Sequence, residues 1–138
     1  MSDDAPAAGA TGGCLCGGVR YEVRGPLRDV VLCHCSRCRR THGHVAAYAA
    51  CRTEHLALVR AEPLRWFDEG TRSRGFCATC GASLFWRAAG RDTTSLAAGT
   101  IDAPTRLRTI AQIFVADAGD YYEPCGPGDR HDAGLPPA

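Results

Sequence analysis

Cys33-His34-Cys35-Ser36-Arg37-Cys38 places three thiols within six residues, and Arg39 and Arg40 follow directly. Three thiols this close together can bind one metal ion from a single turn of the chain. Two further cysteine pairs flank this stretch at a distance, in the sequences Cys-Leu-Cys-Gly at 14–17 and Cys-Ala-Thr-Cys-Gly at 77–81. We interpret the remainder of the chain as a scaffold that holds these three groups of cysteines.

The composition limits the classes of protein to consider. The chain has 138 residues, which suits one domain with a single hydrophobic core. Its formal net charge of +1 provides no bulk attraction to nucleic acid or to a membrane surface. The sequence contains no run of eighteen apolar residues, so no membrane span is expected. All 16 basic residues are arginine, which excludes Schiff-base chemistry on lysine and a P-loop lysine.

The cysteine count bears on the compartment. Nine cysteines are an odd number, which argues against a fully paired disulfide framework. No signal peptide is predicted, because residues 1–13 contain Asp3 and Asp4 and have no apolar segment. A cytoplasmic location is therefore expected, and in a reducing compartment clustered cysteines serve more often as metal ligands or catalysts than as disulfides.

Short apolar segments separated by Gly and Pro recur along the chain, and they predict a mainly β fold in a single domain. The predicted strands are 19–23, 30–32, 45–51, 55–59, 64–67, 72–76, 83–86, 94–98 and 110–115. Residues 36–41 could form one helical turn. Residues 1–11 are predicted to be a disordered N-terminal tail, 12–125 the zinc-binding domain, and 126–138 an irregular C-terminal tail.

The outer cysteines have the pattern of a structural zinc site. They are Cys14, Cys16, Cys77 and Cys80. Each pair is followed directly by glycine, which allows the backbone to turn and direct its N–H groups at the sulfurs. Four thiolates complete the tetrahedral coordination of zinc and leave no open position. The alternatives are two disulfides or free core thiols, although a Cys-x-Cys disulfide would be strained.

The inner cysteines are Cys33, Cys35 and Cys38. Zinc with three protein ligands keeps a fourth position for water or substrate. Three thiolates on a divalent cation leave a net charge of about −1. Arg37, Arg39 and Arg40 could offset this charge and bind the carboxylates of a ligand. A soft fourth ligand is favoured at such a site, so we expect a substrate thiol, which zinc would deprotonate at neutral pH.

Other interpretations of the inner cysteines remain open at this stage. A fourth protein ligand could close the site, and the candidates are Cys51, His34, His42 and His44. Both metals would then be structural, and the protein would be a non-catalytic interaction module. An iron–sulfur cluster also uses closely spaced cysteines, but Cys-x-Cys-x-x-Cys lacks the fuller spacings of those proteins. His34 lies between two ligands and could face the open site as a proton donor or acceptor, or face solvent.

The order of these motifs resembles one known family. The sequences Gly-Cys-Leu-Cys-Gly at 13–17, Cys-His-Cys-Ser-Arg-Cys-Arg at 33–39 and Phe-Cys-Ala-Thr-Cys-Gly at 76–81 are similar to those of glutathione-dependent formaldehyde-activating enzymes. The same domain family includes centromere protein V. The resemblance extends from about residue 12 to residue 115. One departure is Gln112-Ile113-Phe114-Val115, where relatives tend to have His-Ile-Phe-Val.

The resemblance implies a fold, two cofactors and a reaction. The fold would be a small zinc-binding β-tent of antiparallel sheets. Two zinc ions per chain are implied, a structural one at the outer cysteines and a catalytic one at the inner cysteines. The implied reaction joins formaldehyde and glutathione to form S-hydroxymethylglutathione, and it is classed as a carbon–sulfur lyase for the reverse direction. The expected partner is therefore a small-molecule thiol such as glutathione, with no nucleic acid and no membrane. The oligomeric state is not predicted.

Overall fold

The computed structural model describes residues 9–136, and these residues are mainly β, with 45% strand and 12% helix, which confirms the predicted fold class. They form two compact units, and each combines segments that are distant in sequence. Of the described residues, unit 1 contains 9–28 and 49–106, and unit 2 contains 29–48 and 107–136. Each unit is described separately below.

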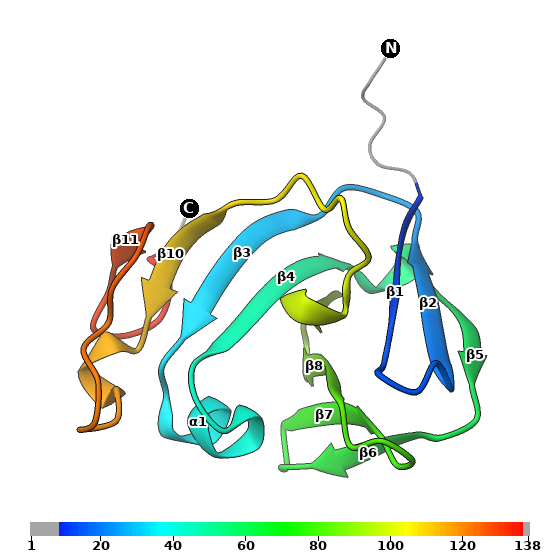
Figure 1. Cartoon of the computed structure of the whole chain (residues 1–138), viewed down its shortest axis with the longest axis horizontal. Helices are drawn as coiled ribbons and strands as arrows, with labels where there is room; N and C mark the ends of the chain where they lie inside the picture. Colours follow the sequence, from blue (N-terminus) through cyan, green and yellow to red (C-terminus); the bar gives the residue numbers. More distant parts are fainter. Residues whose placement is uncertain (1–8, 137–138) are drawn as a thin grey trace. The chain divides into compact units, whose positions relative to one another are not determined.

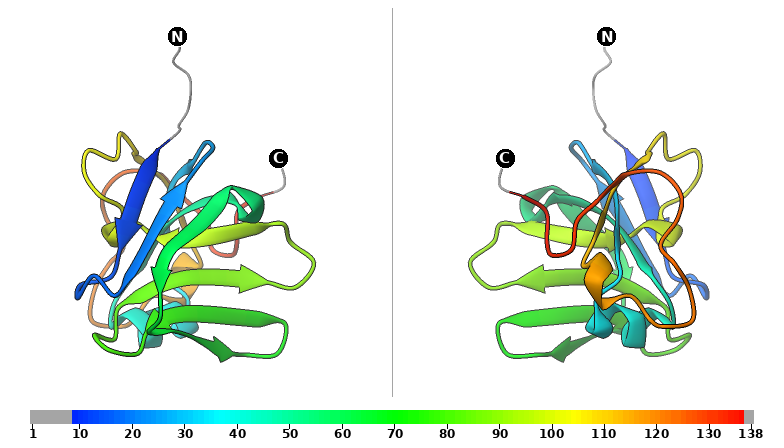
Figure 2. Two further views of the ribbon diagram at one scale, coloured as in Figure 1. Left: turned by 90° about the vertical axis from the view of Figure 1, so that its right-hand side faces the viewer. Right: turned by 90° about the vertical axis from the view of Figure 1, so that its left-hand side faces the viewer.

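Unit 1 contains two sets of antiparallel strands. The first has the order β1-β2-β5, from β1 (Ala10–Gly13), β2 (Val19–Val23) and β5 (Leu56–Ala61). The second has the order β9-β8-β7-β6, from β6 (Leu64–Asp68), β7 (Arg72–Cys77), β8 (Ser83–Ala88) and β9 (Thr93–Ala97). Figure 2 shows β6 to β9, in green, side by side. Two short 3₁₀ helices, Thr53–His55 and Ala98–Thr100, also belong to this unit.

The core of unit 1 follows from the alternation of apolar residues along its strands. In β2 the side chains of Val19, Tyr21 and Val23 are buried and the two residues between them are partly exposed, as expected for a strand with one covered face. The rings of Tyr21 and Phe85 meet edge to face, with their centroids 5.4 Å apart. Gly12 lies so close to the Tyr21 ring that any Cβ there would collide with it. The glycine before the first cysteine pair therefore has a packing role.

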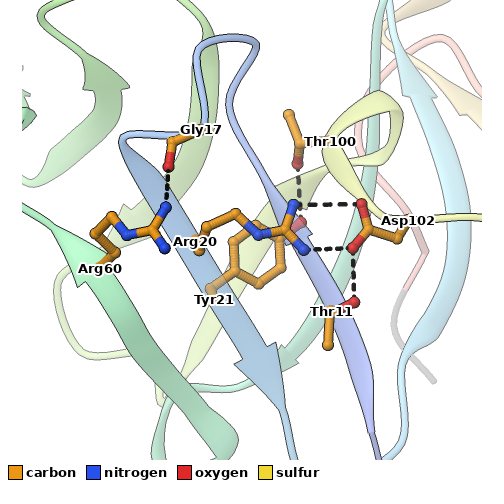
Figure 3. A network of polar contacts seen from close by, with 7 residues as sticks. All are labelled: Thr11, Gly17, Arg20, Tyr21, Arg60, Thr100 and Asp102. Atoms are coloured by element: carbon orange, nitrogen blue, oxygen red, sulfur yellow. Dashed lines mark hydrogen bonds and ion pairs between the residues drawn. The ribbon is translucent and has the colours of Figure 1, made fainter.

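A polar network at the surface of unit 1 fastens β1 and β2 to the loop after residue 100 (Figure 3). The Arg20 guanidinium donates to Asp102 at 2.5 Å, and the Thr11 hydroxyl donates to the same carboxylate at 2.6 Å. The hydroxyls of Tyr21 and Thr100 are 2.8 Å apart. Hydrogen bonds from Arg20 and Thr11 lower the pKa of the Asp102 carboxyl.

Replacing Asp102 tests how much this network contributes. We expect Asp102→Asn to lower the free energy of unfolding by about 1 kcal/mol, near the upper limit for exposed ion pairs. The melting temperature should fall by about 3 °C. Thermal unfolding at pH 7 measures the effect, because a carboxylate with a lowered pKa contributes its full stabilisation above its ordinary pKa and loses it only as the pH falls through the lowered value. Asp92, whose carboxylate lies 3.5 Å from Arg52, provides the comparison. An equal decrease in the melting temperature of Asp92→Asn would contradict this prediction.

Unit 2 has the strand order β11-β10-β3-β4, formed by β3 (Arg28–Cys33), β4 (Ala46–Arg52), β10 (Thr109–Ile113) and β11 (Asp129–Arg130). β4 begins in this unit and continues along the chain into unit 1. β10 pairs in parallel with both β3 and β11, whereas we expected antiparallel sheets. The long connection between β3 and β10 makes a parallel pair possible. It also sets the ends of β3 and β10 side by side (Figure 1), with Ile113 opposite Cys33.

The helix α1 (Ser36–His42) continues directly from the inner cysteines, where one helical turn was predicted. The Cys35 sulfur caps its N-terminus by accepting a hydrogen bond from the Cys38 N–H at 3.3 Å. Gly43 ends the helix in the left-handed conformation with φ of 82°, and its N–H donates to the Arg39 carbonyl at 2.8 Å. A 3₁₀ helix, Val115–Asp117, follows β10.

The predicted strand positions correspond to β2 through β10. β1 and β11 were not predicted. Ala10 and Thr11 belong to β1, although we assigned them to the tail, and the rest of that tail up to residue 8 lies outside the described residues. β11 lies in the segment expected to be irregular. None of the helices within residues 9–136 has the length and apolar character needed to span a membrane.

Candidate metal centres

The outer cluster, which consists of Cys14, Cys16, Cys77 and Cys80, lies within unit 1. Its four sulfurs are all within 4.8 Å of one another. The Cys14 and Cys16 sulfurs are 3.6 Å apart, and those of Cys16 and Cys77 are 3.7 Å apart. A tetrahedral zinc ion with zinc–sulfur bonds of about 2.3 Å would separate its ligands by about 3.8 Å. The donor set and its spacing therefore fit zinc.

Each half of the outer cluster is a turn that ends at a left-handed glycine. Gly17 and Gly81 adopt φ of 79° and 80°, a left-handed conformation that costs glycine little. The Gly17 N–H donates to the Cys14 carbonyl at 3.2 Å, and the Gly81 N–H donates to the Cys77 carbonyl at 2.7 Å. The glycine that follows each pair in the sequence thus closes the turn that brings two sulfurs together.

Backbone N–H groups also stabilise negative charge on the sulfurs of the outer cluster. The N–H of Val19 donates to the Cys14 sulfur at 3.3 Å, and the N–H of Gly18 donates to the Cys16 sulfur at 3.4 Å. Hydrogen bonds from the backbone N–H groups of Cys16 and Ala82 lower the pKa of the Cys80 thiol to about 6. The Gly18 N–H lowers the pKa of Cys16, but hydrogen bonding with Cys14 and burial outweigh it and raise that pKa to about 11. Thiolates bind zinc, so the backbone bonds favour the ligand form most clearly at Cys80.

The disulfide alternative for the outer cysteines is wrong. All nine cysteines are free. The sulfurs of Cys14 and Cys16 are 3.6 Å apart, far longer than the bond of about 2.05 Å in a disulfide.

The inner cluster, which consists of Cys33, Cys35 and Cys38, lies within unit 2. Its sulfurs are also within 4.8 Å of one another, and the group includes no fourth Cys, His, Asp or Glu from the described part of the chain. Cys51, a candidate for the fourth ligand, belongs to neither cluster. Burial raises the pKa of its thiol to about 11, so it is a neutral core residue at pH 7. The three sulfurs could hold a metal ion, and none of the described Cys, His, Asp or Glu residues joins them as a fourth ligand.

The pKa values of Cys35 and Cys33 in the inner cluster are shifted in opposite directions. Hydrogen bonds from Cys33 and Cys38 lower the pKa of Cys35 to about 2, with a further bond from the Cys38 N–H. The pKa of Cys33 is raised, because its thiol donates to Cys35 and Cys38. Metal binding would release the protons that the thiols of this cluster still hold.

His34 occupies a different place from either one that we considered. Its side chain is 2% exposed, so it does not face solvent. Nδ1 lies 2.6 Å from the Tyr122 hydroxyl, and Nε2 lies 2.9 Å from Oε1 of Gln112, so both ring nitrogens are occupied away from the cluster. Successive residues of an extended chain point to opposite sides, which directs His34 away from the sulfurs of its neighbours.

The other two histidine candidates are also paired with tyrosines. Nε2 of His42 lies 2.7 Å from the Tyr48 hydroxyl, and Nδ1 of His44 lies 2.7 Å from the Tyr121 hydroxyl. Neither histidine belongs to the group of possible metal ligands. His34, His42 and His44 therefore each form a hydrogen bond with a tyrosine hydroxyl.

The arginines that follow the inner cysteines differ in exposure. Arg37 and Arg40 are exposed on α1. Arg39 is half-buried, and its Nε is buried without a hydrogen-bond partner among residues 9–136. Its Cδ packs close to Gly119, in the chain after β10. Arg37 and Arg40 are thus placed to contact a dissolved anion.

Sequence reasoning did not identify Gln112 and Tyr122 as the partners of His34, or Tyr121 as the partner of His44. The rings of Tyr121 and Tyr122 lie 4.8 Å apart, and the ring of Tyr122 stacks on His34 with centroids 5.6 Å apart. Burial raises the pKa of Tyr122. The signals in the sequence were Gln112, where relatives tend to have histidine, and the aromatic and acidic character of residues 120–123; neither reveals a partner.

Comparison with known proteins finds a matching family and a similar solved structure. The sequence model of one family, described as glutathione-dependent formaldehyde-activating enzyme, matches residues 9–117, which include all seven cysteines of the two clusters. Among solved structures, a crystal structure of a Rhodobacter sphaeroides protein is 30% identical in sequence and has a TM-score of 0.59. The similarity covers 70% of this chain and 91% of that protein. No curated protein matches the chain.

Proposed function

The chain belongs to the glutathione-dependent formaldehyde-activating enzyme family, and we propose that it is a zinc-dependent enzyme of the carbon–sulfur lyase type. The proposed substrate is a thiol adduct, S-hydroxymethylglutathione, or in the opposite direction glutathione and formaldehyde. The observation that carries this proposal is the inner cluster, in which three sulfurs converge and no fourth protein ligand joins them among the described residues.

We assign structural zinc to the outer cluster and catalytic zinc to the inner cluster. Four protein sulfurs leave no position for a substrate, whereas three leave one. Zinc bound by Cys33, Cys35 and Cys38 would supply the acidity that converts a substrate thiol, with a pKa of about 8.5, into a thiolate at neutral pH.

The proposed reaction is an addition, so the product keeps every atom of glutathione and formaldehyde, and no oxidant or reductant is needed. The thiol sulfur of glutathione forms a bond to the carbonyl carbon of formaldehyde. The carbon–oxygen double bond becomes a single bond, and the proton from the thiol ends on that oxygen. The reverse reaction breaks the carbon–sulfur bond and regenerates the aldehyde.

The protein side chains would bind and orient the anionic thiol. Glutathione carries two carboxylates, and guanidinium groups bind carboxylates through paired hydrogen bonds. Arg37 and Arg40 are exposed on the helix that begins at the inner cluster. We propose that they contact these carboxylates, and that Arg39 supports the same surface from its half-buried position.

We also propose a cytoplasmic location. All nine cysteines are free, and both clusters require reduced thiols to bind metal. A reducing compartment preserves that state. The formal net charge of +1 gives no reason to expect a nucleic-acid partner, so the proposed partner is a small thiol.

Cobalt substitution distinguishes the enzyme from a non-catalytic interaction module. We expect the protein to bind two Co²⁺ ions and glutathione to shift the thiolate-to-cobalt absorption of only one of them, because only the inner cluster offers a free position. Titration by visible absorption spectroscopy measures the shift, with the thiol-free analogue ophthalmic acid as the control ligand. An unchanged spectrum at saturating glutathione would favour the interaction module.

A further inference from the structure

A chain of hydrogen bonds runs behind the inner cluster and connects three segments of unit 2. It begins at the Tyr122 hydroxyl, which is 2.6 Å from Nδ1 of His34, and continues from Nε2 of His34 to Oε1 of Gln112 at 2.9 Å. The Gln112 amide nitrogen then donates to the carbonyls of Cys125 at 2.9 Å and Pro127 at 3.1 Å. His34 and Gln112 are 2% and 0% exposed.

The backbone partners of Gln112 set the direction of its hydrogen bonds. Backbone carbonyls only accept, so the atom of Gln112 that faces Cys125 and Pro127 must be the amide nitrogen. Oε1 of Gln112 therefore accepts a hydrogen bond from the Nε2–H of His34. With the ring proton on Nε2, Nδ1 is left to accept from the Tyr122 hydroxyl. The buried side chains of His34 and Gln112 thus have hydrogen-bond partners at both polar ends, as buried polar groups require.

These hydrogen bonds restrain the backbone that carries two of the inner sulfurs. His34 lies between Cys33 and Cys35, and its own N–H donates to the Ile113 carbonyl at 3.0 Å. Its position is thus fixed by three hydrogen bonds, one from the backbone and two at the ring. A residue fixed this way leaves the flanking cysteines little freedom to turn their sulfurs apart.

Gln112 also holds the segment after β10 in place. This segment, residues 119–127, carries Tyr122 at one end of the hydrogen-bond chain and the accepting carbonyl of Pro127 at the other. The path from Gln112 through the segment to Tyr122 and back through His34 is therefore a closed ring. Loss of any one bond would loosen both the segment and the backbone of the inner cluster.

We propose that Tyr122, His34 and Gln112 are positioning residues that keep the three inner sulfurs converged on one metal position while the fourth position stays open. A site with three protein ligands gains less from coordination than one with four, so it depends more on ligands that are already ordered before the metal binds. The inference rests on the proposed function, because it takes the inner cluster to be a metal site.

The test measures zinc affinity at both clusters of the full-length protein by competition with a chromophoric chelator. The Cys35→Ser variant identifies which of the two zinc ions belongs to the inner cluster. We expect Tyr122→Phe, which removes only the hydroxyl, to weaken zinc binding at the inner cluster about tenfold, the lower end of effects for groups that support ligands. Zinc affinity at the outer cluster should not change, because that cluster lies in the other unit.

Tyr121→Phe is the matched control. It also removes one tyrosine hydroxyl, but the partner of that hydroxyl is His44 and not His34. Zinc affinity at the inner cluster should therefore stay at the wild-type value. Gln112→Glu provides a second variant, because a carboxylate still accepts from His34 but cannot donate to the two carbonyls. We expect faster amide hydrogen exchange over residues 119–127 in this variant, together with at least a tenfold loss of inner zinc affinity.

The outcomes separate the inference from the proposed function. Equal inner zinc affinity in wild type and Tyr122→Phe would overturn the positioning role and leave the metal site standing. An equal loss of zinc affinity at both clusters in Tyr122→Phe would also overturn the positioning role, because it would indicate general destabilisation. A wild-type inner cluster that takes up no zinc would overturn the proposed function and the inference together.

Discussion

Cys35→Ser is expected to lower kcat/KM for the formation of S-hydroxymethylglutathione at least 100-fold and to reduce the zinc content from two ions to one. The variant replaces a sulfur of the inner cluster by a hydroxyl, which remains protonated at neutral pH and is a poor ligand for zinc. The remaining two thiols, Cys33 and Cys38, cannot hold the ion alone. Elemental analysis of the purified variant measures the zinc content.

Cys35→Ser should leave the fold intact, so a loss of activity in this variant would not result from unfolding. The Cys35 sulfur caps α1 by accepting from the Cys38 N–H at 3.3 Å. Serine is among the preferred residues at this helix position, and its hydroxyl can accept the same hydrogen bond. We therefore expect the circular dichroism spectrum to remain that of the wild type.

Cys51→Ala is the control for Cys35→Ser. The Cys51 thiol is buried, but it lies outside both clusters, so its removal should leave turnover and the zinc content unchanged. If Cys51 instead closed the inner site, this control would lose zinc. Wild-type turnover in Cys35→Ser would reject the proposed mechanism.

The strands and cysteine clusters could be predicted because their signals are local. Alternation of apolar residues is visible within each strand, as in Val19–Val23, and glycine after each outer cysteine pair indicates the turn directly. β1 was missed because Ala10, Thr11, Gly12 and Gly13 contain no large apolar residue. Its place in the sheet comes from pairing with β2 and from the close packing of Gly12 on Tyr21, which are tertiary interactions.

The surroundings of the inner cluster could not be predicted because they depend on long-range pairing. Parallel pairing of β10 with β3 brings Gln112 to His34, which is 78 residues away in sequence. The sequence around Gln112 gives no indication of that partner. The same pairing explains why His34 is a buried structural residue and not a group that faces the metal or solvent. Motif spacing identified the cysteines that converge in each cluster, and topology determined which residues surround them.

Cys77→Ser is expected to have the largest effect on stability and to prevent folding at 37 °C. Its side chain is fully buried, with 0% exposure, and its sulfur lies 3.7 Å from that of Cys16, which is 61 residues away in sequence. Structural zinc in small domains contributes about 10–16 kcal/mol of apparent binding free energy. Domains of this size have a total stability of only about 5–15 kcal/mol.

Loss of the outer metal should therefore cancel the stability of the protein, whereas loss of the inner metal should not. We expect Cys77→Ser to lack a cooperative thermal transition and Cys35→Ser to retain one, since each removes one sulfur from one cluster. Chelation of the wild type should reproduce this order, with activity lost at low chelator concentration and circular dichroism lost only at high concentration. A folded Cys77→Ser protein with a wild-type melting temperature would show that the outer sulfurs converge without a structural metal, and the assignment of roles to the two clusters would then fail.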